Sequence, residues 1–167
     1  PMLTRGSKIT KPRYGITGFG ARCDSAAWIG FNIDPLKQGV WHFDQLRVLG
    51  YGTSDRTYPE VQIDTLTIPA RFDSFTSSYL FDLPYKTDSV RINFIVPEGE
   101  EFVFNGAQPM TGNDGINYYA SGVNGARVTS WIDKSEDFDR DLQLVKPDLV
   151  IFGLGINDSA CDQRKFS

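Results

Sequence analysis

The chain has 167 residues, of which 40% are hydrophobic and 23% are charged. These proportions are typical of a globular protein with a buried core, and they exclude a disordered chain. The formal net charge of −4 argues against a nucleic-acid backbone or an anionic membrane as the partner.

Short strands are expected over most of the chain. Residues 1–26 are rich in Gly, Ser, Lys and Pro, which predicts a loop-rich lead-in. Residues 61–68 alternate between apolar and polar side chains, which indicates a half-buried antiparallel strand. Further strands are predicted at residues 28–33, 41–49, 79–81, 90–96 and 102–104. Short strands separated by turns, without helical periodicity, predict a β-sandwich over residues 27–113.

The pattern changes in residues 114–167, where strand and helix signals alternate. Residues 116–120 predict a strand, and apolar residues then recur at helical spacing within residues 135–145. Pro147 ends this helix. Residues 148–154 form a continuous apolar run, as expected for a strand buried on both faces of a parallel sheet. One β-α-β unit of an α/β fold is therefore expected here.

Two loops follow the two expected parallel strands: S-G-V-N-G-A at residues 121–126 and G-I-N-D at residues 155–158. Taken alone, a Gly-rich turn is most often only a turn, and Asn-Asp commonly caps a helix. Open α/β sheets, however, place their sites at the carboxyl ends of strands. The backbone N–H of Gly125 and the side-chain amide of Asn157 could then donate to one oxygen, as an oxyanion hole requires.

The two loops resemble the second and third conserved blocks of the SGNH/GDSL hydrolases. The third block is G-x-N-D at the end of an apolar strand, and F-G-L-G-I-N-D at residues 152–158 is similar to it. The resemblance implies that Gly125 and Asn157 are catalytic residues of the oxyanion hole and that Asp158 supports the loop. It also implies that residues 114–167 are a partial hydrolase domain with a three-layer α/β/α core.

The order of the segments is also similar to that of some carbohydrate O-acetylesterases, including the peptidoglycan type. These enzymes carry a jelly-roll, carbohydrate-module-like β-sandwich before the second block. The resemblance implies an acetylated polysaccharide substrate, and through it a secreted or periplasmic protein. Candidate aromatic residues for stacking on sugar rings are Trp28, Trp41, Tyr51, Tyr58 and Tyr79.

The nucleophile and the base of such an enzyme have no matching motif in the sequence. The family's G-D-S block is not present, and Ser25 follows Cys23-Asp24 with no strand before it. His42 is the only histidine, and it lies in an expected strand of the β-rich part, not in a D-x-x-H block. Because acyl transfer needs an activated serine and a base, we expect an inactive fragment that relies on the rest of a parent chain.

Other functions are weaker on sequence grounds. The main alternative is a non-catalytic carbohydrate-binding or adhesion module. Nucleotide binding by residues 122–125 lacks the full G-x-G-x-x-G motif. No metal or cofactor is predicted, because the sequence has no His/Cys cluster.

No apolar run reaches the ~20 residues of a membrane span. The two cysteines, Cys23 and Cys161, could form a disulfide or remain buried thiols.

Overall fold

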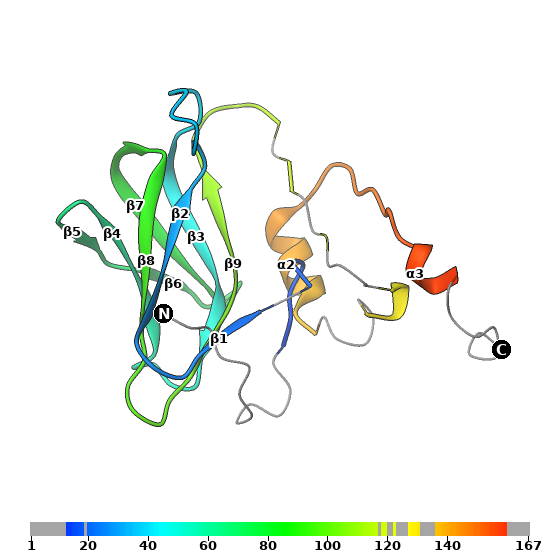
Figure 1. Ribbon diagram of the computed structural model, residues 1–167, viewed down its shortest axis with the longest axis horizontal. Coiled ribbons are helices and arrows are strands. Elements are labelled where there is room, and N and C mark those ends of the chain that lie inside the picture. The colour runs from blue at the N-terminus through cyan, green and yellow to red at the C-terminus, as the bar shows by residue number, and fades with distance from the viewer. Residues whose placement is uncertain are drawn as a thin grey trace. The chain divides into compact units, whose positions relative to one another are not determined.

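The computed structural model describes residues 13–18, 20–116, 118–119, 122, 127–130 and 136–159. The chain divides into two compact units. The first contains Ala21–Asn117, and the second combines Lys11–Gly20 with Tyr118–Ser167. The strands β1 to β9 belong to the first unit, and the helices α2 and α3 belong to the second (Figure 1).

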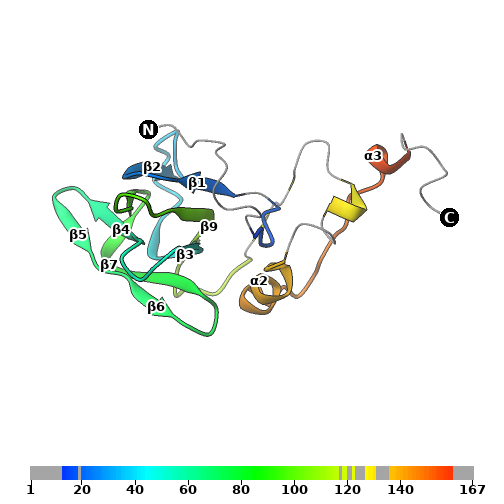
Figure 2. The same cartoon turned by 90° about the horizontal axis from the view of Figure 1, so that it is seen from below.

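The first unit contains two antiparallel sheets, seen from two directions in Figures 1 and 2. The five-stranded sheet has the spatial order β1 (Ala21–Cys23), β9 (Phe102–Met110), β3 (Phe43–Gly52), β7 (Ser78–Thr87) and β6 (Arg71–Asp73). The four-stranded sheet has the order β2 (Ala27–Asn32), β8 (Ser89–Ile95), β4 (Tyr58–Ile63) and β5 (Leu66–Ile68). Two antiparallel sheets with a shared core are compatible with the predicted β-sandwich, although β1 lies in residues 1–26, where only a loop-rich lead-in was expected.

Alternation of side chains builds the hydrophobic core between the sheets. In β8, Val90, Ile92 and Phe94 are buried, while the residues between them point to the other face of the four-stranded sheet. The Phe94 ring lies 5.2 Å from the ring of Phe102 and 5.4 Å from that of Phe104, both on β9 of the other sheet. These aromatic contacts join the two sheets.

Three differences from the expected strands have local causes. Residues 61–68 form the hairpin β4–β5, because Asp64 adopts a positive φ of 51° and turns the chain. Strand β7 continues through Pro84, which lies where the pairing of β7 with β3 is irregular and no ladder N–H is needed. Strand β3 continues past the expected end at residue 49 to Gly52. At Gly50, beside a bulge between β3 and β9, a Cβ would lie 2.4 Å from the Val103 carbonyl oxygen. Only glycine fits there without displacing β9.

The second unit places α2 (Phe138–Val145) against the segment of residues 13–18. The N–H of Ile16 donates to Asp141 Oδ2 at 3.0 Å, and the N–H of Asp137 donates to the Tyr14 carbonyl at 3.0 Å. The Asp141 side chain is buried and also accepts hydrogen bonds from the Arg140 guanidinium. Helix α2 ends at Lys146 in the left-handed conformation, directly before Pro147, as the sequence predicts.

The predicted α/β/α core is wrong for the described part of the chain. Both sheets are antiparallel, and residues 148–155 form no strand. Residues 116, 118 and 119 are not in a strand either, while 117 and 120 lie outside the described residues. The apolar run at 149–152 is between 46% and 82% exposed. A strand buried on both faces needs a partner along its edges and cover on its faces, and a run of apolar residues reveals neither.

Candidate functional site

The candidate site is the short segment that contains Asn157 and Asp158. Gly155 has a φ of 123°, a conformation that residues with a side chain rarely adopt, and it turns the chain into α3 (Ile156–Ser159). The N–H of Ser159 donates to the Gly155 carbonyl at 3.0 Å, which closes this single turn. Asn157 and Asp158 are both half-buried on it.

A hydrogen bond connects this turn with the residues that follow the first motif. The N–H of Val128 lies 3.1 Å from Asp158 Oδ1 and 3.3 Å from Oδ2, so it donates to the carboxylate across thirty positions of sequence. Val128 follows Gly125 by three residues. The contact therefore joins Val128, two residues after the S-G-V-N-G-A segment, to the G-x-N-D turn. The role of Asp158 as a support of the loop stays a prediction.

The structure describes only part of the predicted oxyanion hole. Gly125 lies outside the described residues, as do its neighbours at 123, 124 and 126. Asn157 is described, and its side chain is half-buried next to Asp158. The distance between the two predicted donors therefore stays a prediction.

Ser25 and His42 match neither the nucleophile block nor the base block of the family. Both are exposed and lie in loops of the first unit, His42 directly before β3. Among the described residues, the hydroxyl of Ser25 donates to Asp24 Oδ1 at 3.4 Å. His42 was expected inside a strand, and this detail was wrong. Cys23 is a free, buried thiol, and burial together with Asp24 raises its pKa to about 11.

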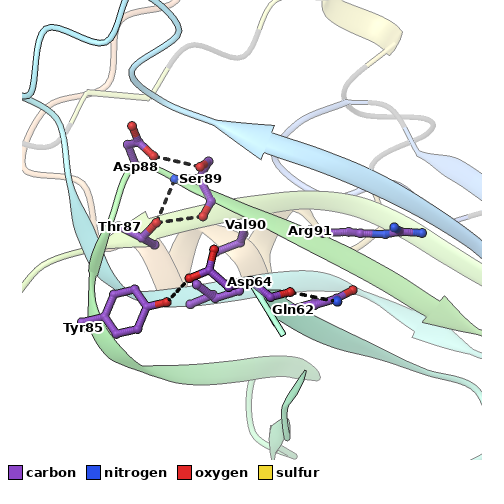
Figure 3. Close-up of a pocket in the computed structure, with 9 residues that line it drawn as sticks. Gln62, Asp64, Tyr85, Thr87, Asp88, Ser89, Val90 and Arg91 are labelled. Atoms are coloured by element: carbon purple, nitrogen blue, oxygen red, sulfur yellow. Dashed lines mark hydrogen bonds between the residues drawn. The ribbon is translucent and has the colours of Figure 1, made fainter. Parts of the chain in front are cut away.

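A second candidate surface lies on the solvent face of the four-stranded sheet. A hollow of about 330 Å³ lies on it, and a second of about 540 Å³ is lined both by this sheet and by Tyr85 and Thr87 of β7 in the other sheet; Arg91 lines both. Figure 3 shows the larger hollow, where the hydroxyl of Tyr85 donates to Asp64 Oδ2 at 2.7 Å. This hydrogen bond raises the pKa of Tyr85. Trp28, at 45% exposure, lines the smaller hollow.

The other aromatic candidates are placed differently from Trp28. Trp41 is 59% exposed in the loop before β3, whereas Tyr51, Tyr58 and Tyr79 are half-buried. Sequence reasoning missed the polar residues beside Trp28. Their signal was available, because the alternation of residues 89–95 places Arg91 and Asn93 together on the face opposite the core.

The described residues contain no group of three or more His, Cys, Asp or Glu side chains that could hold a metal ion. Within the same part of the chain, no helix has the length and apolar character to span a membrane. Comparisons with protein-family models, curated proteins and solved structures gave no match.

Proposed function

We propose that the chain is part of a serine ester hydrolase of the SGNH/GDSL type that removes acyl groups, chiefly acetyl, from a carbohydrate. The observation that supports this proposal is the hydrogen bond from Val128, two residues after the segment that resembles the second block, to Asp158 in the segment that resembles the third. In this proposal Gly125 and Asn157 are the oxyanion donors. The nucleophilic serine and the base come from polypeptide outside these 167 residues.

The chemistry requires charge stabilisation at one oxygen. The serine hydroxyl attacks the ester carbonyl carbon while the base takes its proton, and the carbonyl oxygen becomes an oxyanion. The tetrahedral intermediate then breaks its bond to the sugar oxygen, which takes the proton from the base and leaves as a hydroxyl, and water later releases the acid from the acyl-enzyme. The N–H of Gly125 and the amide of Asn157 would stabilise the oxyanion in both steps. Donors fixed before the reaction stabilise the transition state most.

The experiment is hydrolysis of 4-nitrophenyl acetate by the protein at its natural length, with Asn157→Ala beside the matched variant Asn113→Ala. Asn113 lies on the exposed segment after β9, so Asn113→Ala removes an amide side chain away from the candidate site and serves as the control. We expect Asn157→Ala to lower kcat about 10²–10³-fold, equivalent to ~2.7–4 kcal/mol, with KM nearly unchanged. The 167-residue chain alone should release no acid.

An unchanged kcat in Asn157→Ala would contradict the assignment of the oxyanion hole. If the protein at natural length hydrolyses no ester but still binds polysaccharide, the non-catalytic carbohydrate-binding module replaces the hydrolase as the better proposal. A polysaccharide substrate also implies a secreted or periplasmic protein. This location belongs to the proposal and depends on the substrate class.

A further inference from the structure

The solvent face of the four-stranded sheet carries two rows of side chains that cross three strands. Trp28 on β2 is opposite Asn93 on β8, which is opposite Glu60 on β4. In the next row, Arg91 on β8 lies between Gly30 on β2 and Gln62 on β4. Neighbouring strands lie about 4.8 Å apart, so these side chains form one continuous surface. We call it the Trp28 face.

An aromatic platform stands at one end of the Trp28 face. The guanidinium carbon of Arg91 lies 4.3 Å from the centroid of the Trp28 ring, a cation–π contact that holds the indole in place. At Gly30, an added Cβ would meet only the edge of the Trp28 ring, at 3.9 Å. The position above Gly30, at the edge of the indole, is therefore open, and part of a sugar ring whose C–H face stacks on Trp28 could lie there.

Polar groups continue from the platform along β8. The smaller hollow is lined by Trp28, Glu60 and Asn93. The larger is lined by Gln62, by Asp64 and Asp88 in the turns that follow β4 and β7, and by Tyr85 and Thr87 of β7, with Arg91 shared. Strand β8 has 7 residues, and at about 3.3 Å per residue it spans ~20 Å. A surface of this length, with one aromatic ring and many planar polar groups, fits an extended chain of sugar rings. Sugar hydroxyls both donate and accept hydrogen bonds, and this surface offers both.

Charge selects among polymers of this shape. The Trp28 face and its hollows carry three carboxylates, Glu60, Asp64 and Asp88, against one guanidinium. The whole chain is also negative, with a net charge of −4. A polyanion such as a nucleic acid or a uronic-acid polymer is therefore repelled. An uncharged polymer is not.

We propose that the Trp28 face binds a neutral polysaccharide, with a sugar ring stacked on Trp28 and hydroxyls hydrogen-bonded to Glu60, Asn93 and Arg91. This proposal rests on the proposed function in one respect, which is that the polymer is acetylated. If the protein is such a hydrolase, the Trp28 face holds the polymer whose acyl groups are removed elsewhere in the protein.

The test is affinity electrophoresis of the full chain in native gels that contain acetylated glucomannan, xyloglucan or hydroxyethyl cellulose. A gel with polygalacturonate represents the polyanion class. We expect retardation in at least one of the neutral gels and none with polygalacturonate. Trp28→Ala should weaken this binding about tenfold or more, as loss of a central aromatic anchor does. The matched variant Phe75→Ala, which removes an exposed aromatic ring outside both hollows, should bind as the original chain does.

A second variant separates binding from folding. Gly30→Leu fills the open space beside the indole, and replacing a strand glycine should not lower the thermal unfolding temperature. Loss of retardation without a lower unfolding temperature supports the proposal. No retardation in any neutral gel, equal binding by Trp28→Ala and Phe75→Ala, or a preference for polygalacturonate overturns it. Because no ester turnover is measured, this result is independent of the Asn157 experiment.

Discussion

At the scale of single residues, polar side chains fasten the loops at the ends of the sandwich. Glu100, in the turn before β9, accepts hydrogen bonds from the hydroxyls of Ser54 and Thr57 and forms an ion pair with Arg56. The side chain is nearly buried, so its oxygens exchange most of their water for these partners. The hydrogen bonds, from Ser54 first and Thr57 second, lower the pKa of Glu100, and the charge of Arg56 adds to the effect.

This lowered pKa predicts a pH-dependent stability. The unfolded chain takes up a proton at Glu100 near the ordinary pKa of 4.5, whereas the folded chain holds the carboxylate ionised to lower pH. The stabilisation by Glu100 is therefore full above about pH 4.5 and is lost as the pH falls through the folded-state pKa. We expect Glu100→Gln to lower the thermal unfolding temperature at pH 7 and to have little effect near pH 2. The exposed neighbour in Glu98→Gln is the control, and a pH-independent difference for Glu100→Gln would contradict this account.

The candidate site illustrates what sequence shows at the residue scale. Asn157 and Asp158 could be selected because their side chains stand in a recognisable motif. The partner of Asp158, the N–H of Val128, could not be selected, since every residue except proline carries the same group. Only the fold decides which N–H meets a carboxylate. The polar residues around Trp28 could be grouped once the alternation of two strands was combined with their pairing.

At the scale of elements, the aromatic contacts between β8 and β9 should dominate the stability of the sandwich. Phe94 is buried and packs on two phenylalanines of the other sheet. We expect Phe94→Ala to lower the free energy of unfolding by about 3–5 kcal/mol, through lost burial and the cavity that remains. Denaturant unfolding measures this loss. Phe75→Ala removes the same ring from an exposed position in the β6–β7 turn and should change the stability by less than about 1 kcal/mol.

Elements with a strong periodic signal were predictable, and short or irregular ones were not. The alternation of residues 89–95 marks β8 closely, and helical spacing with Pro147 marks the end of α2. Strands β1 and β6 have 3 residues each, too few for a period to be seen. The strand expected at residues 148–154 fails for another reason. Its apolar run indicates that burial is favourable, but pairing depends on other segments.

At the scale of the whole molecule, residues 149–152 expose four consecutive apolar side chains, L-V-I-F, and they belong to neither sheet of the described part of the chain. Such a run has high β-propensity and no charge, which favours pairing with another chain. The first unit also exposes apolar side chains, such as Leu36 and Phe75, but a run of four consecutive exposed apolar residues is found, among the described residues, in the second unit.

We therefore predict that the 167-residue chain self-associates with rising concentration and that Ile151→Lys restores a monomer. A lysine in the middle of the run adds charge repulsion between copies and breaks the continuous apolar surface. Light scattering after size-exclusion chromatography, at a series of concentrations, measures the mass directly. Val40→Lys places the same charge at a single exposed apolar residue in the loop before β3 and should leave the association unchanged. A chain that stays monomeric at every concentration would contradict the prediction. It would show that another segment covers the exposed run in solution.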